Sequence, residues 1–174
     1  MFGGRCSKYT NSRKKKNIDE ASIRNFVDER NNLMFNTFAP KEEDFVPKRK
    51  YTVGIPKAFS VYTLYPFYAW YFHKLGIKTV LSDEVSPSGA ARTESTYCFP
   101  AEIAHGAVQN ILDKGADFIF LPHFRDMESH ESDIHANFCP ITQSLPYYIQ
   151  KAFPEIPEGK ILAPVVSFRT GLDK

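Results

Sequence analysis

The chain has 174 residues, of which 43% are hydrophobic and 24% are charged, so it can bury the core of one globular domain. Its formal net charge of +2 gives no electrostatic reason to expect a nucleic acid or a membrane surface as partner. No apolar run approaches the roughly 18 residues of a spanning helix, and the polar, basic N-terminus has no secretory pattern. Three cysteines are too few for a disulfide scaffold, so we expect a reducing, cytoplasmic compartment.

Charge is divided unevenly along the chain. Residues 1–50 hold twelve basic and seven acidic side chains, whereas the remainder holds ten basic and thirteen acidic ones. The basic run at residues 13–16 is typical of a solvated stretch. We therefore predict a basic N-terminal appendage over residues 1–49 and an α/β domain over residues 50–174. Because the chain stops just after its last predicted strand, we expect it to be a fragment of a longer protein.

The appendage contains one predicted helix, over about residues 20–35. Asp19 could cap it, and an apolar stripe recurs along it at helical spacing: Ile23, Phe26, Val27, Leu33 and Met34. A single amphipathic helix needs a surface to lie on, which either the following domain or a partner would provide. Residues 36–49 carry two prolines and mixed charges, which is typical of a linker.

Strand and helix patterns alternate from residue 51 onward. β-prone runs occupy residues 51–55, 77–81, 117–121 and 160–166, and helical patterns occupy residues 59–75, 99–114 and 140–152. This alternation predicts an α/β fold with a parallel, doubly wound sheet of about four strands. We expect the strand order 2-1-3-4, as in flavodoxin-like and Rossmann-like sheets.

Aromatic residues make up 14% of the chain and gather on the first crossover helix. Eight of them lie within fourteen residues: Phe59, Tyr62, Tyr65, Phe67, Tyr68, Trp70, Tyr71 and Phe72. A helix with rings on all sides is buried on more than one side. We therefore predict that this helix is the domain's main interface. The sheet would cover one side, and the N-terminal helix, a second copy of the chain or a missing segment would cover the other.

Two cysteines stand where a parallel sheet places its ligands, outside the carboxyl ends of its strands. Cys98 precedes Phe99-Pro100 and Cys139 precedes Pro140, so each lies at or just before a predicted helix start. The N-terminus of a helix stabilises a thiolate, which is the form that binds metals. Two thiols placed alike could converge on one metal or cluster, or each could be a small buried residue beside a proline. Their spacing of 41 residues, without a CxxC motif, by itself favours the second interpretation.

Other polar residues near this edge are weaker candidates. The loop at residues 126–135 contains possible metal ligands without a recognised spacing, which is typical of a solvated acidic loop. His105 lies mid-helix beside Gly106 and could face a cofactor, although such a histidine more often packs or forms hydrogen bonds. Lys57 could contact a phosphate, but neither GxGxxG nor GxxxxGK[ST] is present. No nucleophile-elbow motif occurs, so we assign no catalytic residue and leave enzyme activity open.

Several motifs together resemble one protein family. They lie at residues 53–58, 64–67, 81–83, 98–106, 119–122 and 139–147, and residues 3–9 are similar to the family's junction segment. The chain resembles the domain attached to activases of the 2-hydroxyglutaryl-CoA dehydratase system. It is also similar to the cluster-holding subunits of 2-hydroxyacyl-CoA dehydratase and benzoyl-CoA reductase. The combination of Cys-Phe-Pro and Cys-Pro motifs is specific, and the resemblance covers nearly the whole chain.

The resemblance implies an iron–sulfur protein of anaerobic bacteria that takes part in electron transfer. Cys98 and Cys139 would be the cluster-facing thiolates, with Cys6 as a third candidate ligand. His105 and Lys57 remain candidate cofactor-binding residues. A [4Fe–4S] cluster normally has four thiolate ligands, so two or three would leave an open site or require a ligand from elsewhere. ATPase modules and an acyl-CoA dehydratase or reductase would be partners, and a second copy could complete a homodimer. No ATPase motif occurs in this chain.

Two interpretations of other kinds stay open. The domain could be a cofactor-free docking module of the same large protein, with its two thiols buried and far apart. Alternatively, Cys98 and His105 could act as the nucleophile and the base of a small-molecule enzyme, which requires hydrogen-bond reach between them.

Overall fold

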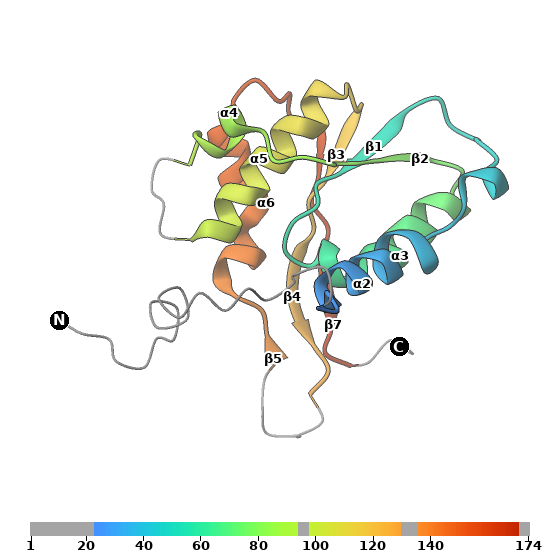
Figure 1. Cartoon of the computed structure of the whole chain (residues 1–174). Coiled ribbons are helices and arrows are strands. Elements are labelled where there is room, and N and C mark those ends of the chain that lie inside the picture. The colour runs from blue at the N-terminus through green and yellow to red at the C-terminus, as the bar shows by residue number, and fades with distance from the viewer. Residues whose placement is uncertain (1–22, 94–97, 130–135, 171–174) are drawn as a thin grey trace, which may run out of the picture.

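The computed structural model describes residues 23–93, 98–129 and 136–170. A four-stranded parallel sheet, called sheet A, has the order β2-β1-β3-β6 (Figure 1). Its strands are β1 (Thr52–Ile55), β2 (Lys78–Leu81), β3 (Phe118–Phe120) and β6 (Ile161–Leu162). The predicted α/β fold and the strand order 2-1-3-4 are therefore confirmed.

Three helices cover the two faces of sheet A. They are α3 (Val61–Lys74), α5 (Phe99–Asp113) and α6 (Pro140–Ala152). Successive strand residues point to opposite faces, so Val53 and Ile55 pack with α3, whereas Ile119 and Leu121 pack with α5 and α6. The helix that follows β1 is α3, and the first helix after β3 is α6. Because these two helices lie on opposite faces, the sheet is doubly wound.

The helix boundaries follow signals in the sequence. α5 and α6 each have a proline in the first turn, where a backbone N–H has no partner within the helix. α3 and α5 end just before Gly76 and Gly115, whose φ angles of 66° and 70° favour glycine. The bounds of α6 agree with the predicted helix over residues 140–152, whereas the short helix α4 (Pro87–Ala90) was not expected.

The N-terminal helix lies on α3, but through residues other than those predicted. α2 (Phe26–Asn32) continues into a π-helical turn, η2 (Leu33–Thr37). The predicted stripe is exposed at Phe26 and Val27, whereas the ring of Phe35 packs against those of Tyr62 and Tyr65. A π turn adds one residue to the helical repeat and so rotates the following side chains by about 100°. Side chains that a regular helical period places in one apolar stripe therefore no longer point in one direction after this turn.

Residues 36–49 contact the domain at several points, although most of them are exposed, as expected for a linker. A short 3-10 helix, η3 (Glu42–Asp44), lies in this segment. The indole Nε1 of Trp70 donates to the Phe38 carbonyl at 2.9 Å, and the rings of Phe45 and His73 lie 5.5 Å apart. The segment that precedes the sheet therefore contacts the ring-bearing side chains of α3. The aromatic composition of this helix predicted that a second side of it would be covered.

Sheet A is extended by a second, smaller sheet. Its order is β5-β4-β7, formed by β4 (His123–Met127), β5 (Ala136–Asn137) and β7 (Val165–Phe168). β7 pairs in parallel with β4, just as β6 pairs with β3. Because β4 follows β3 and β7 follows β6 along the chain, the second pair of strands continues the first (Figure 1). The strand predicted over residues 160–166 is interrupted at Ala163-Pro164. The prediction of a solvated loop is wrong for residues 126–127, which belong to β4, while residues 130–135 lie outside the described part.

Asp126 is a buried charge in the smaller sheet. Its carboxylate is 3% exposed and accepts hydrogen bonds from Ser167 on β7 and from Arg125 Nε, the latter at 2.9 Å. These donors, Ser167 above all, lower the pKa of Asp126 below its ordinary value. The ionised carboxylate therefore stabilises the fold above about pH 4, the ordinary range of aspartate. This stabilisation is lost as the pH falls through the lowered pKa.

Replacing Asp126 with asparagine should destabilise the protein at pH 7, and the effect should shrink as the pH is lowered towards 3. The amide keeps the shape of the side chain but removes the charged acceptor, which protonation also removes from the parent protein. Urea unfolding of both proteins across this pH range measures the difference between their free energies of unfolding. A difference that does not change with pH would contradict the stabilising role of the ionised carboxylate.

Candidate functional site

Cys98 and Cys139 occupy equivalent positions, because each is the N-cap residue of a helix. Cys98 caps α5 and Cys139 caps α6, and neither side chain forms a capping hydrogen bond. Cys98 is half-buried and Cys139 is exposed. The predicted placement at two helix starts is therefore correct, and both thiols remain available for other contacts.

The two capped helices lie on the same face of sheet A. Val108 and Ile111 of α5 share one buried core with Leu145 and Ile149 of α6. Figure 1 shows α5 and α6 beside each other. In parallel α/β sheets the crossover helices run back against the strands, so their N-termini lie at the carboxyl edge. Cys98 and Cys139 thus belong to one face and one edge of the sheet, which is where open α/β sheets bind their ligands.

A complete metal-ligand set is absent from the described residues. Within residues 23–93, 98–129 and 136–170, no group of three or more His, Cys, Asp or Glu side chains is placed to hold a metal ion. Cys6, the third thiol that the resemblance implied, lies outside these residues. The described part of the chain therefore offers the thiols of Cys98 and Cys139 at this edge, and any further ligand has to come from elsewhere.

His105 has the packing role that a mid-helix histidine usually takes. It is buried, its Nδ1 lies 2.7 Å from the Ala101 carbonyl oxygen, and its ring stacks on Phe153 at 6.1 Å. Among the described residues, no hydrogen bond joins His105 to Cys98. In the described part of the chain His105 is therefore not hydrogen-bonded to Cys98 as a base, and a role of His105 beside a cofactor stays a prediction.

Lys57 lies at the carboxyl end of β1 and contacts the N-terminal segment. Its backbone N–H donates to Ser82 Oγ at 2.7 Å, which links the ends of β1 and β2. Its Nζ lies 4.1 Å from the centre of the Phe35 ring, a cation–π contact. This contact accounts for the position of the side chain, and a phosphate-binding role for Lys57 stays a prediction.

A pocket of about 250 Å³ opens at the same edge, between α3 and α6. Its lining comes from the start of α3, from β4 and from the first turn of α6: Phe59, Ser60, Thr63, Leu64, Met127, Phe138 and Thr142. Neighbouring strands β1 and β3 lead to helices on opposite faces, so this is the switch point of the sheet. Phe138 and Thr142 flank Cys139, and the pocket therefore adjoins one of the two candidate thiols. Leu64 and Thr142 lie within the motifs on which the family resemblance rests, but none of those motifs predicted a pocket here.

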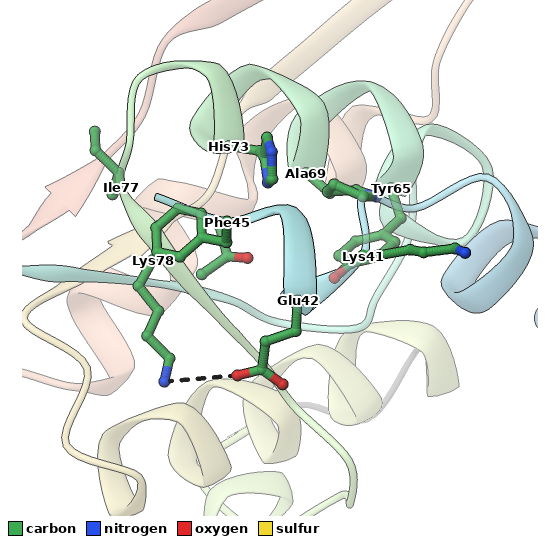
Figure 2. A pocket seen from close by; sticks show the side chains of 10 residues that line it. Lys41, Glu42, Phe45, Tyr65, Ala69, His73, Ile77 and Lys78 are labelled. Atoms are coloured by element: carbon green, nitrogen blue, oxygen red, sulfur yellow. Dashed lines mark ion pairs between the residues drawn. The ribbon is translucent and has the colours of Figure 1, made fainter. Parts of the chain in front are cut away.

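A second pocket, of about 260 Å³, lies away from this edge, where the N-terminal segment crosses α3 and β2 (Figure 2). Lys78 and Glu42 form an ion pair at its rim with an N–O distance of 4.0 Å. Burial raises the pKa of Tyr65, which also lines it, so its hydroxyl stays protonated. Residues of the predicted linker, between 40 and 45, form part of the lining of this pocket.

An aromatic groove of about 620 Å³ separates α3 from the strands β6 and β7. Tyr68, Phe72 and Phe120 form its buried floor, while Phe67 and Tyr71 remain substantially exposed. The ring of Phe67 lies 5.7 Å from that of Phe168 across the groove. The side of α3 that the N-terminal segment does not cover is thus open, and its use as the main interface stays a prediction.

In the described ranges, none of the helices combines the length and the apolar character that crossing a membrane requires. A search of the curated proteins found no match, and a search of the solved structures found none either. Residues 52–174 match the family model described as a CoA enzyme activase uncharacterised domain. This match covers sheet A, both N-cap cysteines and all seven residues that line the pocket between α3 and α6. The chain therefore belongs to this family of CoA enzyme activase domains, which confirms the relation to acyl-CoA dehydratase activases that its motifs indicated.

Proposed function

We propose that this domain supplies Cys98 and Cys139 as thiolate ligands of an iron–sulfur cluster. The observation that carries the proposal is their equivalent position as N-caps of two neighbouring helices on one face and one edge of the sheet. The thiolate is the form of cysteine that binds metals. Neither thiol is committed to a capping hydrogen bond, so both can turn towards a shared ligand.

Cysteine thiolates are the right type of ligand for such a cluster, but two of them are fewer than the cluster needs. Thiolates are its usual ligands, and four are normal for a [4Fe–4S] cluster. Since the described residues provide no larger ligand group, Cys6, another chain or a non-protein ligand would complete the site. A cluster bound there would supply one-electron chemistry, and the chain's own part would be to hold it with thiolates and helix ends at a partly shielded edge.

Family membership suggests where such electrons would go. The matched family is that of CoA enzyme activase domains. An activase-type protein would pass electrons to an acyl-CoA dehydratase or a related reductase and would work with ATPase modules. This chain would then act as the electron-transfer part of the assembly.

Anaerobic reconstitution of the chain with iron and sulfide should load the parent protein, while Cys98→Ser and Cys139→Ser should each lose at least about half of the bound iron. Serine keeps the size of the side chain but is a poor ligand for iron in such clusters. Iron per chain and visible absorbance measure the loading, and Cys6→Ser decides whether Cys6 completes the site. Ser144→Ala, one turn into α6, is the matched control and should bind as much iron as the parent.

A second candidate function is a cofactor-free docking module, which the aromatic groove between α3 and β7 favours. Apolar grooves with exposed rings are typical of contact surfaces. The same reconstitution separates the two functions. Iron in neither the parent nor the cysteine variants, or equal iron in all of them, would refute the cluster and favour docking.

A further inference from the structure

We propose that two copies of this chain pair through the open edge that β6 and β7 form together. β6 is an outer strand of sheet A, and β7 is an outer strand of the smaller sheet. In the described part of the chain, both strands therefore pair on one side only. The proposal does not depend on a cluster at Cys98 and Cys139. It names a partner for the docking surface of the second candidate function.

Unpaired backbone groups line this open edge. The carbonyls of Lys160, Leu162 and Pro164 each accept a hydrogen bond at 2.9 Å from the neighbouring segment of β3 and β4. Along a strand, the N–H and C=O groups of successive residues point to opposite sides. Those of Ala163 and Val165 therefore point away from the paired strands. The proline lacks its N–H on the paired side, so the residues that face outward keep their donors.

The open edge carries no charge. Residues 161–168 include no charged side chain, and Val165 is 64% exposed. Proteins usually protect an open edge with charged side chains, above all lysine, because an unpaired strand binds other strands. The opposite edge of sheet A follows this rule, since β2 begins with Lys78, which pairs with Glu42. The edge of β6 and β7 lacks this protection, as expected for an edge that a further strand covers.

A second copy of the chain is the partner that fits this edge. Two copies related by a two-fold axis would pair their edges in antiparallel fashion, and the outward backbone groups of each copy would then satisfy those of the other. Such pairing brings the same residues of both copies close together, and an edge without charges allows this without repulsion. The net charge of +2 per chain is also too small to oppose association.

The aromatic groove beside the edge adds apolar surface to the contact. Residues 162–168 form one wall of this groove, and rings of α3 form the other. Phe67 and Tyr71 are exposed there, and no charged side chain is among the lining residues. Apolar side chains of a second copy at the edge would cover these rings. Because an isolated pair of strands is marginally stable in water, we expect the covered rings to supply much of the affinity.

Sedimentation equilibrium of the full chain, without iron or sulfide, tests the proposal separately from the cluster. We expect a concentration-dependent dimer of twice the chain mass of 19.9 kDa. Val165→Lys should raise the dissociation constant of the dimer at least about tenfold, because a symmetric interface contains the change twice and the two lysines repel each other. Val46→Lys is the matched control at an exposed valine in the segment before β1, and it should leave the constant unchanged.

Ala163→Pro is a second variant, because it removes an outward N–H and no hydrogen bond within the sheet. It should also weaken the dimer, and urea unfolding shows whether each variant keeps the stability of the parent. A parent chain that stays monomeric at every concentration would overturn the proposal. A dimer with the same dissociation constant in the parent, Val165→Lys and Ala163→Pro would overturn it as well, since the contact would then lie elsewhere on the chain.

Discussion

Phe153→Ala should lower the free energy of unfolding by about 3–5 kcal/mol, the range for truncating a buried aromatic ring. Phe153 is fully buried, and it joins the core formed by α5, α6 and β3. Its ring stacks on His105 at 6.1 Å and lies 4.3 Å from the guanidinium carbon of Arg92. Alanine leaves a cavity that these neighbours cannot fill, because they are held by their own hydrogen bonds.

Urea or thermal unfolding measures this loss, and two variants control it. Phe153→Leu retains much of the buried apolar volume and should cost clearly less than Phe153→Ala. Phe99→Ala removes a ring that is 70% exposed at the start of α5 and should change the stability by only about 0.5 kcal/mol. A loss for Phe153→Ala as small as that for Phe99→Ala would show that the α5–α6 core is not packed as described.

The main sheet could be predicted because each of its elements carries its own local signal. Pro100 and Pro140 mark the starts of α5 and α6, while Gly76 and Gly115 mark the ends of α3 and α5. Right-handed crossovers then leave few strand orders to consider. The order 2-1-3-4 follows from these local features and one topological rule.

The smaller sheet escaped prediction because its strands carry weak local signals: β4 is partly charged and β5 has only two residues. The acidic residues that begin at Asp126 are typical of a solvated loop when only neighbouring residues are considered. Asp126 is buried because Ser167, 41 residues further along the chain, donates a hydrogen bond to it. The π turn that contains Phe35 is a comparable case, since no periodicity in the sequence indicates the helical register in which this ring packs on α3.

One part of the candidate site could likewise be predicted from the sequence, and another part could not. The placement of Cys98 and Cys139 followed from the prolines after them, since proline in a first turn locates the N-cap. The pocket lined by Thr142 had no such signal, because threonine in the first turn of a helix is ordinary. Only the tertiary structure shows that residues from the start of α3, from β4 and from α6 meet around one pocket.

Gly54→Ala should destabilise the protein by about 1–3 kcal/mol, the usual cost of overpacking a core. Gly54 lies in the middle of β1 and faces α5, where a Cβ atom would come within 2.1 Å of Ile111 Cγ2 and 3.1 Å of Ala116 Cβ. Neither neighbour can turn away, since Ile111 is fully buried and the Ala116 Cβ is fixed to the backbone. The added methyl group therefore has to push α5 away from the sheet.

A double-mutant cycle with Ile111→Ala tests this cause directly. Ile111→Ala alone should cost about 2–5 kcal/mol through the cavity that it leaves. It also removes the atom nearest to the added methyl group, and the Ile111 Cβ that remains lies 3.4 Å away. Gly54→Ala should therefore cost much less in the Ile111→Ala background than in the parent, and a strongly non-additive free energy of unfolding is expected. Additive effects would mean that β1 tolerates the methyl group without contact with α5, and that Gly54 is required there for the conformation of the strand.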